Sequence, residues 1–179
     1  PGPATSFDYV DATPAYVLWT RSDTGRAVLW KIDPSGASGT PLVIPVGAGN
    51  TWNLHTTSGV GAPWTATSFD YVDATTAYVL WTRGDTGQAV LWKIDPSAAS
   101  GTPLVIPVAN GNAWSLSSTG GVGAPWTATS FEYVNATTAY VLWTRSDTGQ
   151  TQLWQIDPSA ASGTPLVIPI DAGNMWNLY

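Results

Sequence analysis

The tripeptide Asp-Thr-Gly occurs three times in the chain, at 23–25, 85–87 and 147–149. Two such carboxylates held face to face in a dry site would share a proton and act as a general acid–base pair. Here each tripeptide follows a Thr-Arg-containing run, precedes Gln or Arg, and lies between two apolar segments. Asp and Gly in that position are typical of a tight turn in a β-hairpin. The spacing therefore predicts three turns and no carboxylate pair.

A second recurring group has the chemistry of sugar recognition. Trp52, Trp114 and Trp176 lie 62 residues apart, each beside amide or hydroxyl side chains. An exposed indole stacks on the apolar face of a sugar while neighbouring amides hydrogen-bond its hydroxyls. The same Trp residues suit the capping of a sheet edge equally well, so both interpretations stay open. The candidate ligand-binding residues are Trp52, Trp114, Trp176, Asn50, Asn53, Asn112, Ser115 and Asn174.

Other residue types that perform chemistry are sparse. His55 is the only His, and its equivalents one and two repeats later are Ser117 and Tyr179. Asp70 and Asp73 supply too few oxygens for the about six to eight ligands of Ca²⁺. The chain has no Cys, and no nucleophile–base pair recurs with the repeat. We expect no catalytic residue, no metal and no cofactor, and so no enzyme.

Composition narrows the class of protein. The 179 residues include 11 Trp, 18 Gly and 14 Pro, while charged residues make up 10%. This pattern is typical of short strands joined by turns. The net charge is −6 and the six basic residues are scattered, which argues against nucleic acid as a partner. No apolar run approaches the roughly 20 residues of a membrane-spanning helix, so we expect no membrane insertion.

Internal repetition dominates the sequence. The aromatic positions return at a step of 62 residues without insertion or deletion, as in the sets Phe7, Phe69, Phe131; Trp19, Trp81, Trp143; and Trp30, Trp92, Trp154. One structural unit therefore occurs three times. We expect one repeat domain over 1–179, with units at 1–62, 63–124 and 125–179.

The second repeat predicts strands only. β-branched and aromatic residues with Gly and Pro punctuation, and the absence of a helical period of about 3.6 residues, indicate an all-β unit. The expected strands are 65–72, 76–83, 88–95, 102–108 and a short one at 112–116.

The second and third strands of this unit are apolar on both faces. Tyr78 and Leu80 point one way, and Val79 and Trp81 point the other. The next strand behaves alike, with Val90, Trp92 and Ile94 on one face and Ala89 and Leu91 on the other. A sheet with one wet face would alternate apolar and polar residues. The pattern predicts a small sheet stacked between copies of itself, with open ends that expose apolar faces and favour assembly.

The motif LWxxxDxGxAxLWxID, preceded by PWTA, resembles bacterial extracellular Trp-rich repeats of the FG-GAP/VCBS type. Trp64 and Trp126 match the leading Trp of those repeats, and the pairs Trp81 with Trp92 and Trp143 with Trp154 match the later ones. The resemblance implies a β-propeller blade and an extracellular or cell-surface location. The Asp-x-Asp-x-Asp-Gly calcium loop of the family is absent, because its place reads FDYVDAT or FEYVNAT.

These features predict an all-β fold of three 62-residue β-propeller blades. With a rotation of about 60° per blade, two chains would complete a six-bladed ring, so the chain itself is an expected partner, as a homodimer. The alternative is a three-fold β-trefoil or β-prism closed within one chain. The expected function is a multivalent, lectin-like carbohydrate-binding module with one weak site per repeat and glycans as ligands. The alternative function is a structural or self-assembling repeat without a small-molecule ligand.

Overall fold

The structure of the protein is a computed structural model. It describes residues 3–10, 14–21, 23, 26–36, 38–42, 64–83, 85–96, 100–104, 114–115, 126–159 and 162–166. These residues form strands and turns and contain no helix. No described segment is therefore a helix of the length and hydropathy that crossing a membrane requires.

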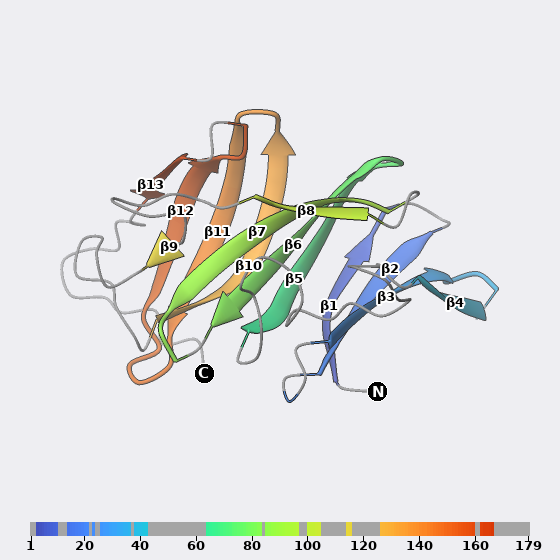
Figure 1. Cartoon of the computed structure of the whole chain (residues 1–179), viewed down its shortest axis with the longest axis horizontal. Helices are drawn as coiled ribbons and strands as arrows, with labels where there is room; N and C mark the ends of the chain where they lie inside the picture. The colour runs from blue at the N-terminus through green and yellow to red at the C-terminus, as the bar shows by residue number, and fades with distance from the viewer. Residues whose placement is uncertain are drawn as a thin grey trace. The chain divides into compact units, whose positions relative to one another are not determined.

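The first repeat forms a four-stranded antiparallel sheet. Its strands follow one another in chain order, as a meander (Figure 1). They are β1 (Ala4–Tyr9), β2 (Ala15–Arg21), β3 (Arg26–Asp33) and β4 (Ser38–Leu42).

The third repeat forms the same meander of four antiparallel strands. Its strands are β10 (Trp126–Asn135), β11 (Thr138–Arg145), β12 (Thr151–Asp157) and β13 (Ser162–Leu166). The pairing registers of the first and third sheets agree residue for residue. Val17 pairs with Trp30 in the first sheet, and Val141 pairs with Trp154 in the third.

The second repeat forms a sheet of five strands. Four follow in order, namely β5 (Trp64–Asp73), β6 (Thr76–Arg83), β7 (Gln88–Asp95) and β8 (Ser100–Leu104). The fifth, β9 (Trp114–Ser115), pairs with the beginning of β7.

The sequence-based prediction of an all-β fold is thus confirmed. The strands expected at 65–72, 76–83 and 88–95 are present with ends shifted by no more than one residue. The strand expected at 102–108 begins earlier, at Ser100, and is described only to Leu104. Of the short strand expected at 112–116, residues 114 and 115 are described.

The described chain divides into two compact units. One comprises residues 1–81 with 92–103, and the other residues 82–91 with 104–179. The first unit holds the complete first sheet together with β5, and the second unit holds the complete third sheet.

A pair of Trp residues lies at the centre of each sheet. The ring centroids of Trp19 and Trp30 are 5.7 Å apart, and those of Trp143 and Trp154 are 5.3 Å apart, in tilted arrangements. Trp81 and Trp92 in the second sheet form the same pair at 5.6 Å. Tilted rings bring the positive edge of one indole to the negative face of the other, which adds to the gain from burial.

Burial differs between the three sheets. In the second sheet both faces of β6 are covered, since Tyr78, Val79, Leu80 and Trp81 are all buried. In the first sheet the face of Tyr16 and Leu18 is buried, and the opposite face is only half-buried at Trp19. The expected burial on both faces is therefore confirmed for the second sheet, while the first has one covered face.

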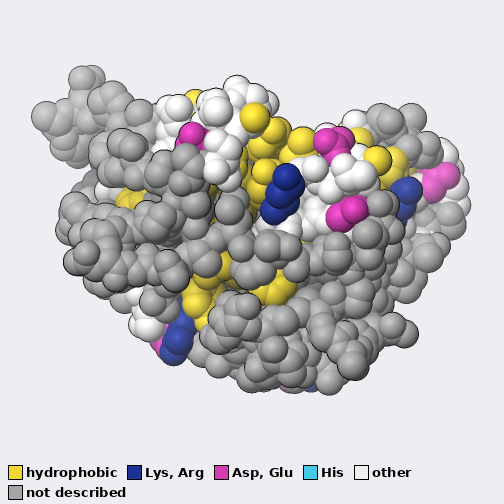
Figure 2. Space-filling model, turned by 45° about the horizontal axis from the view of Figure 1, so that its top comes forward, with side chains coloured by type: hydrophobic (Ala, Val, Ile, Leu, Met, Phe, Trp, Pro, Cys, Tyr) yellow, Lys and Arg dark blue, Asp and Glu magenta, His cyan; other side chains and the backbone are white. Residues whose placement is uncertain are grey.

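The third sheet has the opposite arrangement to the first. Val141 and Trp143 are buried, whereas Tyr140, Leu142 and Thr144 on the other face are half-buried. Hydrophobic side chains also reach the surface in several places on the side of the molecule drawn in Figure 2. Charged side chains in that view are scattered among uncharged ones.

Candidate functional site

The best-defined contact between repeats joins the first sheet to the edge strand of the second. It lies wholly within residues 4–71, inside one compact unit. Four side chains of β1 and β2 reach three residues of β5. We call the first set the capping face (Ser6, Asp8, Tyr16 and Thr20) and the second set the receiving edge (Ala66, Phe69 and Tyr71).

The capping face arises from strand alternation. Asp8 pairs with Tyr16, and Ser6 pairs with Leu18, so these side chains point to the same side of the sheet. Phe7 and Val17 form the next pair and point to the opposite side. A register shift between Ala4 and Ser6 marks a bulge at the start of β1.

Two polar side chains of the capping face bond the backbone of β5. The Ser6 hydroxyl accepts a hydrogen bond from the Phe69 N–H at 3.1 Å, and it lies 3.5 Å from the Phe69 carbonyl oxygen, to which it donates. The Asp8 Oδ2 accepts a hydrogen bond from the Tyr71 N–H at 2.6 Å. A carboxylate acceptor makes this last bond charge-assisted, and such bonds are shorter and stronger than neutral ones.

These bonds satisfy groups that an edge strand would leave open. β5 is the first strand in the order of its sheet, so one side of its backbone has no strand beside it among the described residues. Unpaired edge groups are an invitation to pairing with other chains. Side chains of the preceding sheet occupy them here in place of another strand.

Tyr16 and Thr20 complete the contact. The Tyr16 ring stacks on Tyr71 with centroids 5.1 Å apart, and it meets Phe69 at 5.3 Å in a tilted arrangement. The Thr20 hydroxyl donates to the Ala66 carbonyl at 3.0 Å and lies 3.2 Å from the Thr5 hydroxyl. Both residues are buried. Aromatic packing and backbone hydrogen bonds therefore act together over the length of β5.

Burial in this contact affects the ionisation of Tyr16. Loss of solvent raises the pKa of the Tyr16 phenol above its ordinary value of 10.0, and the nearby Tyr71 raises it further. Burial disfavours the charged phenolate because a phenolate is poorly solvated inside the contact. The neutral phenol is therefore the form that packs between the sheets.

The sequence analysis did not identify the capping face. It treated the strands as apolar on both sides and searched for function among Trp and Asn residues. The signal was present, because Ser6, Asp8 and Thr20 are polar residues within otherwise apolar strands and recur at the 62-residue step. A short polar residue at a fixed place in a two-faced apolar strand marks a position that must hydrogen-bond something buried.

The Asp-Thr-Gly motif is confirmed as a turn in the second and third repeats. Gly87 and Gly149 have φ of 70° and 71°, a region that glycine adopts without steric cost. The Gly149 N–H donates to the Arg145 carbonyl at 2.8 Å, and the Gly87 N–H makes the equivalent bond to Arg83.

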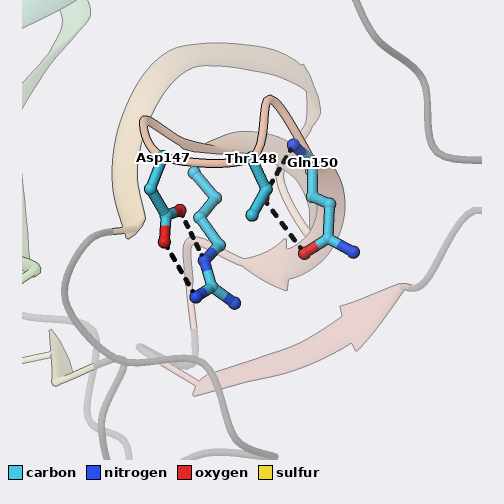
Figure 3. A network of polar contacts seen from close by, with 4 residues as sticks. Asp147, Thr148 and Gln150 are labelled. Atoms are coloured by element: carbon cyan, nitrogen blue, oxygen red, sulfur yellow. Dashed lines mark hydrogen bonds and ion pairs between the residues drawn. The ribbon is translucent and has the colours of Figure 1, made fainter.

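The carboxylate of each motif binds the arginine two residues earlier. In the third repeat, Arg145 Nε and Nη2 donate to the two oxygens of Asp147 at 2.6 and 2.9 Å (Figure 3). The same pair forms between Arg83 and Asp85. Hydrogen bonding from the arginine is the main cause that holds the pKa of Asp85 and Asp147 below the ordinary value. These carboxylates stabilise turns, in keeping with the predicted role.

Most of the predicted ligand-binding residues lie outside the described part of the chain. These are Trp52, Trp176, Asn50, Asn53, Asn112 and Asn174. Only the backbone of Trp114 and Ser115 is described, and it pairs with Ala89 and Gln88 at the edge of the second sheet. The carbohydrate-binding function therefore stays a prediction.

No cluster of three or more potential metal ligands occurs among the described residues. Asp73, one of the two carboxylates weighed for calcium, accepts hydrogen bonds from the N–H and hydroxyl of Thr75 at 2.8 and 3.0 Å. These bonds are the main cause of its lowered pKa, and they close the turn between β5 and β6.

Comparison with known proteins gives no relative: neither a protein-family model nor a curated protein matches the chain. The resemblance to FG-GAP/VCBS-type repeats stays a prediction.

Proposed function

We propose that the chain is a structural repeat module that works by stacking its sheets, and that it has no small-molecule ligand. The capping of the β5 edge by Ser6 and Asp8 carries this proposal. A sheet whose edge groups are bonded by the preceding repeat has a neighbour as its natural partner. The covered second sheet, with both faces of β6 buried, agrees with this role.

The architecture we propose for the stack is a set of β-propeller blades. Support comes from the four-stranded meanders, which are the usual blade unit, and from the sequence resemblance. Completion of a six-bladed ring by two chains, and a location outside the cell, belong to the same proposal.

Removal of the Asp8 carboxylate tests the proposal. We expect Asp8→Ala to lower the free energy of unfolding by about 1–3 kcal/mol, since the Tyr71 N–H would lose its acceptor in a buried contact. Urea unfolding followed by Trp fluorescence measures the change. We also expect a single transition for the wild-type chain, because the sheets stabilise one another.

Asp23→Ala is the matched control, because Asp23 is exposed and its partner Arg21 belongs to the same turn. Its effect should stay within about 0.5 kcal/mol. Equal effects of the two substitutions, or separate unfolding of the first sheet in the wild-type chain, would contradict a stacking function.

A further inference from the structure

Two surfaces of the chain repeat the residues of the described contact without its partner. The third sheet carries a second capping face: Ser130, Glu132, Tyr140 and Thr144, at a distance of 124 residues from Ser6, Asp8, Tyr16 and Thr20. The first sheet carries a second receiving edge: Ala4, Phe7 and Tyr9, at a distance of 62 residues from Ala66, Phe69 and Tyr71.

The capping face of the third sheet is open to solvent. Ser130 and Glu132 are exposed, and Tyr140 and Thr144 are half-buried, whereas Tyr16 of the first sheet is only 4% exposed. The receiving edge of the first sheet is also open, with Phe7 59% and Tyr9 58% exposed. These two are among the few large hydrophobic residues that the described chain exposes.

The open capping face already has the geometry of the occupied one. Ser130 pairs with Leu142 and Glu132 pairs with Tyr140, the same register as in the first sheet. The Thr144 hydroxyl lies 3.2 Å from the Thr129 hydroxyl, as the Thr20 hydroxyl lies 3.2 Å from that of Thr5. A surface that is held in its binding geometry before contact loses less entropy on binding.

The open receiving edge has the matching backbone groups. Phe7 and Tyr9 occupy the positions of Phe69 and Tyr71, whose N–H groups point away from the paired strand toward the capping side chains. On the other side of β1, the Val10 N–H bonds back to Pro14. Alternation along the strand therefore directs the Phe7 and Tyr9 N–H groups outward.

We propose that the capping face of the third sheet binds the receiving edge of the first sheet in a second copy of this chain. Ser130 takes the place of Ser6 at the Phe7 N–H of the second copy, and Glu132 takes the place of Asp8 at its Tyr9 N–H. The Tyr140 ring packs on Phe7 and Tyr9 of that copy. This interaction rests on the proposed stacking function and names its partner.

The contact joins unlike surfaces, so it is head-to-tail. A heterologous contact of this kind leaves one capping face and one receiving edge free after two chains have met once. Each surface is then satisfied only by closure into a ring or by further addition of chains.

One difference from the described contact bears on its strength. Glu132 is one methylene longer than Asp8, so its carboxylate reaches the edge with more freedom to lose. We expect Glu132→Asp to bind at least as tightly as the wild type. Glu132→Ala should weaken association about tenfold, because it removes one charge-assisted hydrogen bond.

Complementary blocked variants test the proposal. Phe7→Lys/Tyr9→Lys blocks the receiving edge, and Ser130→Lys/Glu132→Lys blocks the capping face; all four residues are exposed or paired with solvent on that side. Sedimentation velocity over a range of concentrations measures the mass of each variant. We expect the wild type to associate, each blocked variant alone to be monomeric, and their equimolar mixture to form dimers and nothing larger.

Ala74→Lys/Ala136→Lys is the charge-matched control, because both residues are exposed in hairpin turns away from the two surfaces. It should associate like the wild type. A monomeric wild type, a blocked variant that still dimerises alone, or a mixture that stays monomeric while the wild type associates would each overturn the proposal. Any of these results leaves the stacking function standing if Asp8→Ala still destabilises the monomer, and only a null result for Asp8→Ala removes that function.

Discussion

The first and third sheets carry nearly the same residues, yet opposite faces of them are buried. Tyr16 is buried in the first sheet, and its equivalent Tyr140 is half-buried in the third. The order reverses on the other face, where Trp19 is half-buried and Trp143 is fully buried. The comparison teaches that a neighbour, and not the residue itself, decides which face of such a sheet stabilises the fold.

The largest expected effect concerns the Trp pair. We predict that Trp143→Ala lowers the free energy of unfolding by about 3–5 kcal/mol, since a fully buried indole leaves a large cavity. Trp19→Ala should cost about 1–2 kcal/mol, because part of that indole already contacts water. Urea unfolding at low protein concentration measures both. Equal losses would break the comparison.

The Tyr pair should show the reverse order. We predict a loss of about 3 kcal/mol for Tyr16→Ala, which removes the ring stacked on Phe69 and Tyr71. Tyr140→Ala should cost about 1 kcal/mol or less in the monomer, where its ring has no receiving edge. The same denaturation experiment applies. A larger loss at Tyr140 than at Tyr16 would show that the covered face has been assigned to the wrong end.

A smaller effect is expected at high pH. Because the pKa of Tyr16 is raised in the folded state, folded chains keep this proton at a pH where unfolded chains have lost it. The contribution is therefore fully present below pH 10.0, the ordinary value, and is lost as the pH rises through the folded-state pKa.

The measurement is the free energy of unfolding of the wild type and of Tyr16→Phe from about pH 9 to about pH 11. The wild type should lose stability more steeply, while the other tyrosines contribute equally to both chains. Parallel curves would show that Tyr16 ionises as freely in the contact as in the unfolded chain.

The smallest expected effect concerns the turns, which do not depend on sheet burial. Asp85 and Asp147 are similarly exposed, at 49% and 46%, and each binds its arginine. We predict that Arg83→Ala raises the pKa of Asp85 toward its ordinary value and leaves that of Asp147 unchanged. NMR titration of the carboxyl carbons measures both. A shift at Asp147 would indicate that the turns are coupled through the sheets.

The strands and turns could be predicted from the sequence, because each depends on local pattern. The alternation in AYVLW places Tyr78 and Trp81 on opposite faces, and Asp-Thr-Gly between two strands fits a turn with a glycine at positive φ. The 62-residue step identified the repeats by itself. These features need no knowledge of what lies across from a strand.

The capping contact could not be predicted in the same way. Asp8 acts on the Tyr71 N–H, 63 positions away, and nothing local in the sequence indicates which backbone group a lone carboxylate will meet. The difference between Tyr16 and Tyr140 was equally hidden, since the two residues have nearly identical neighbours in sequence. Only the stacking of one sheet on the edge of the next distinguishes them.

Amide hydrogen exchange by NMR tests the central claim most directly, by comparing the Tyr71 and Tyr9 amides in a dilute sample. We predict slow exchange at Tyr71, whose N–H is bonded to Asp8, and fast exchange at Tyr9, which occupies the same position with no capping side chain described beside it. Tyr71→Phe keeps the backbone group and should keep the protection, whereas Asp8→Ala should remove it. Exchange at Tyr71 as fast as at Tyr9 in the wild type would contradict the account.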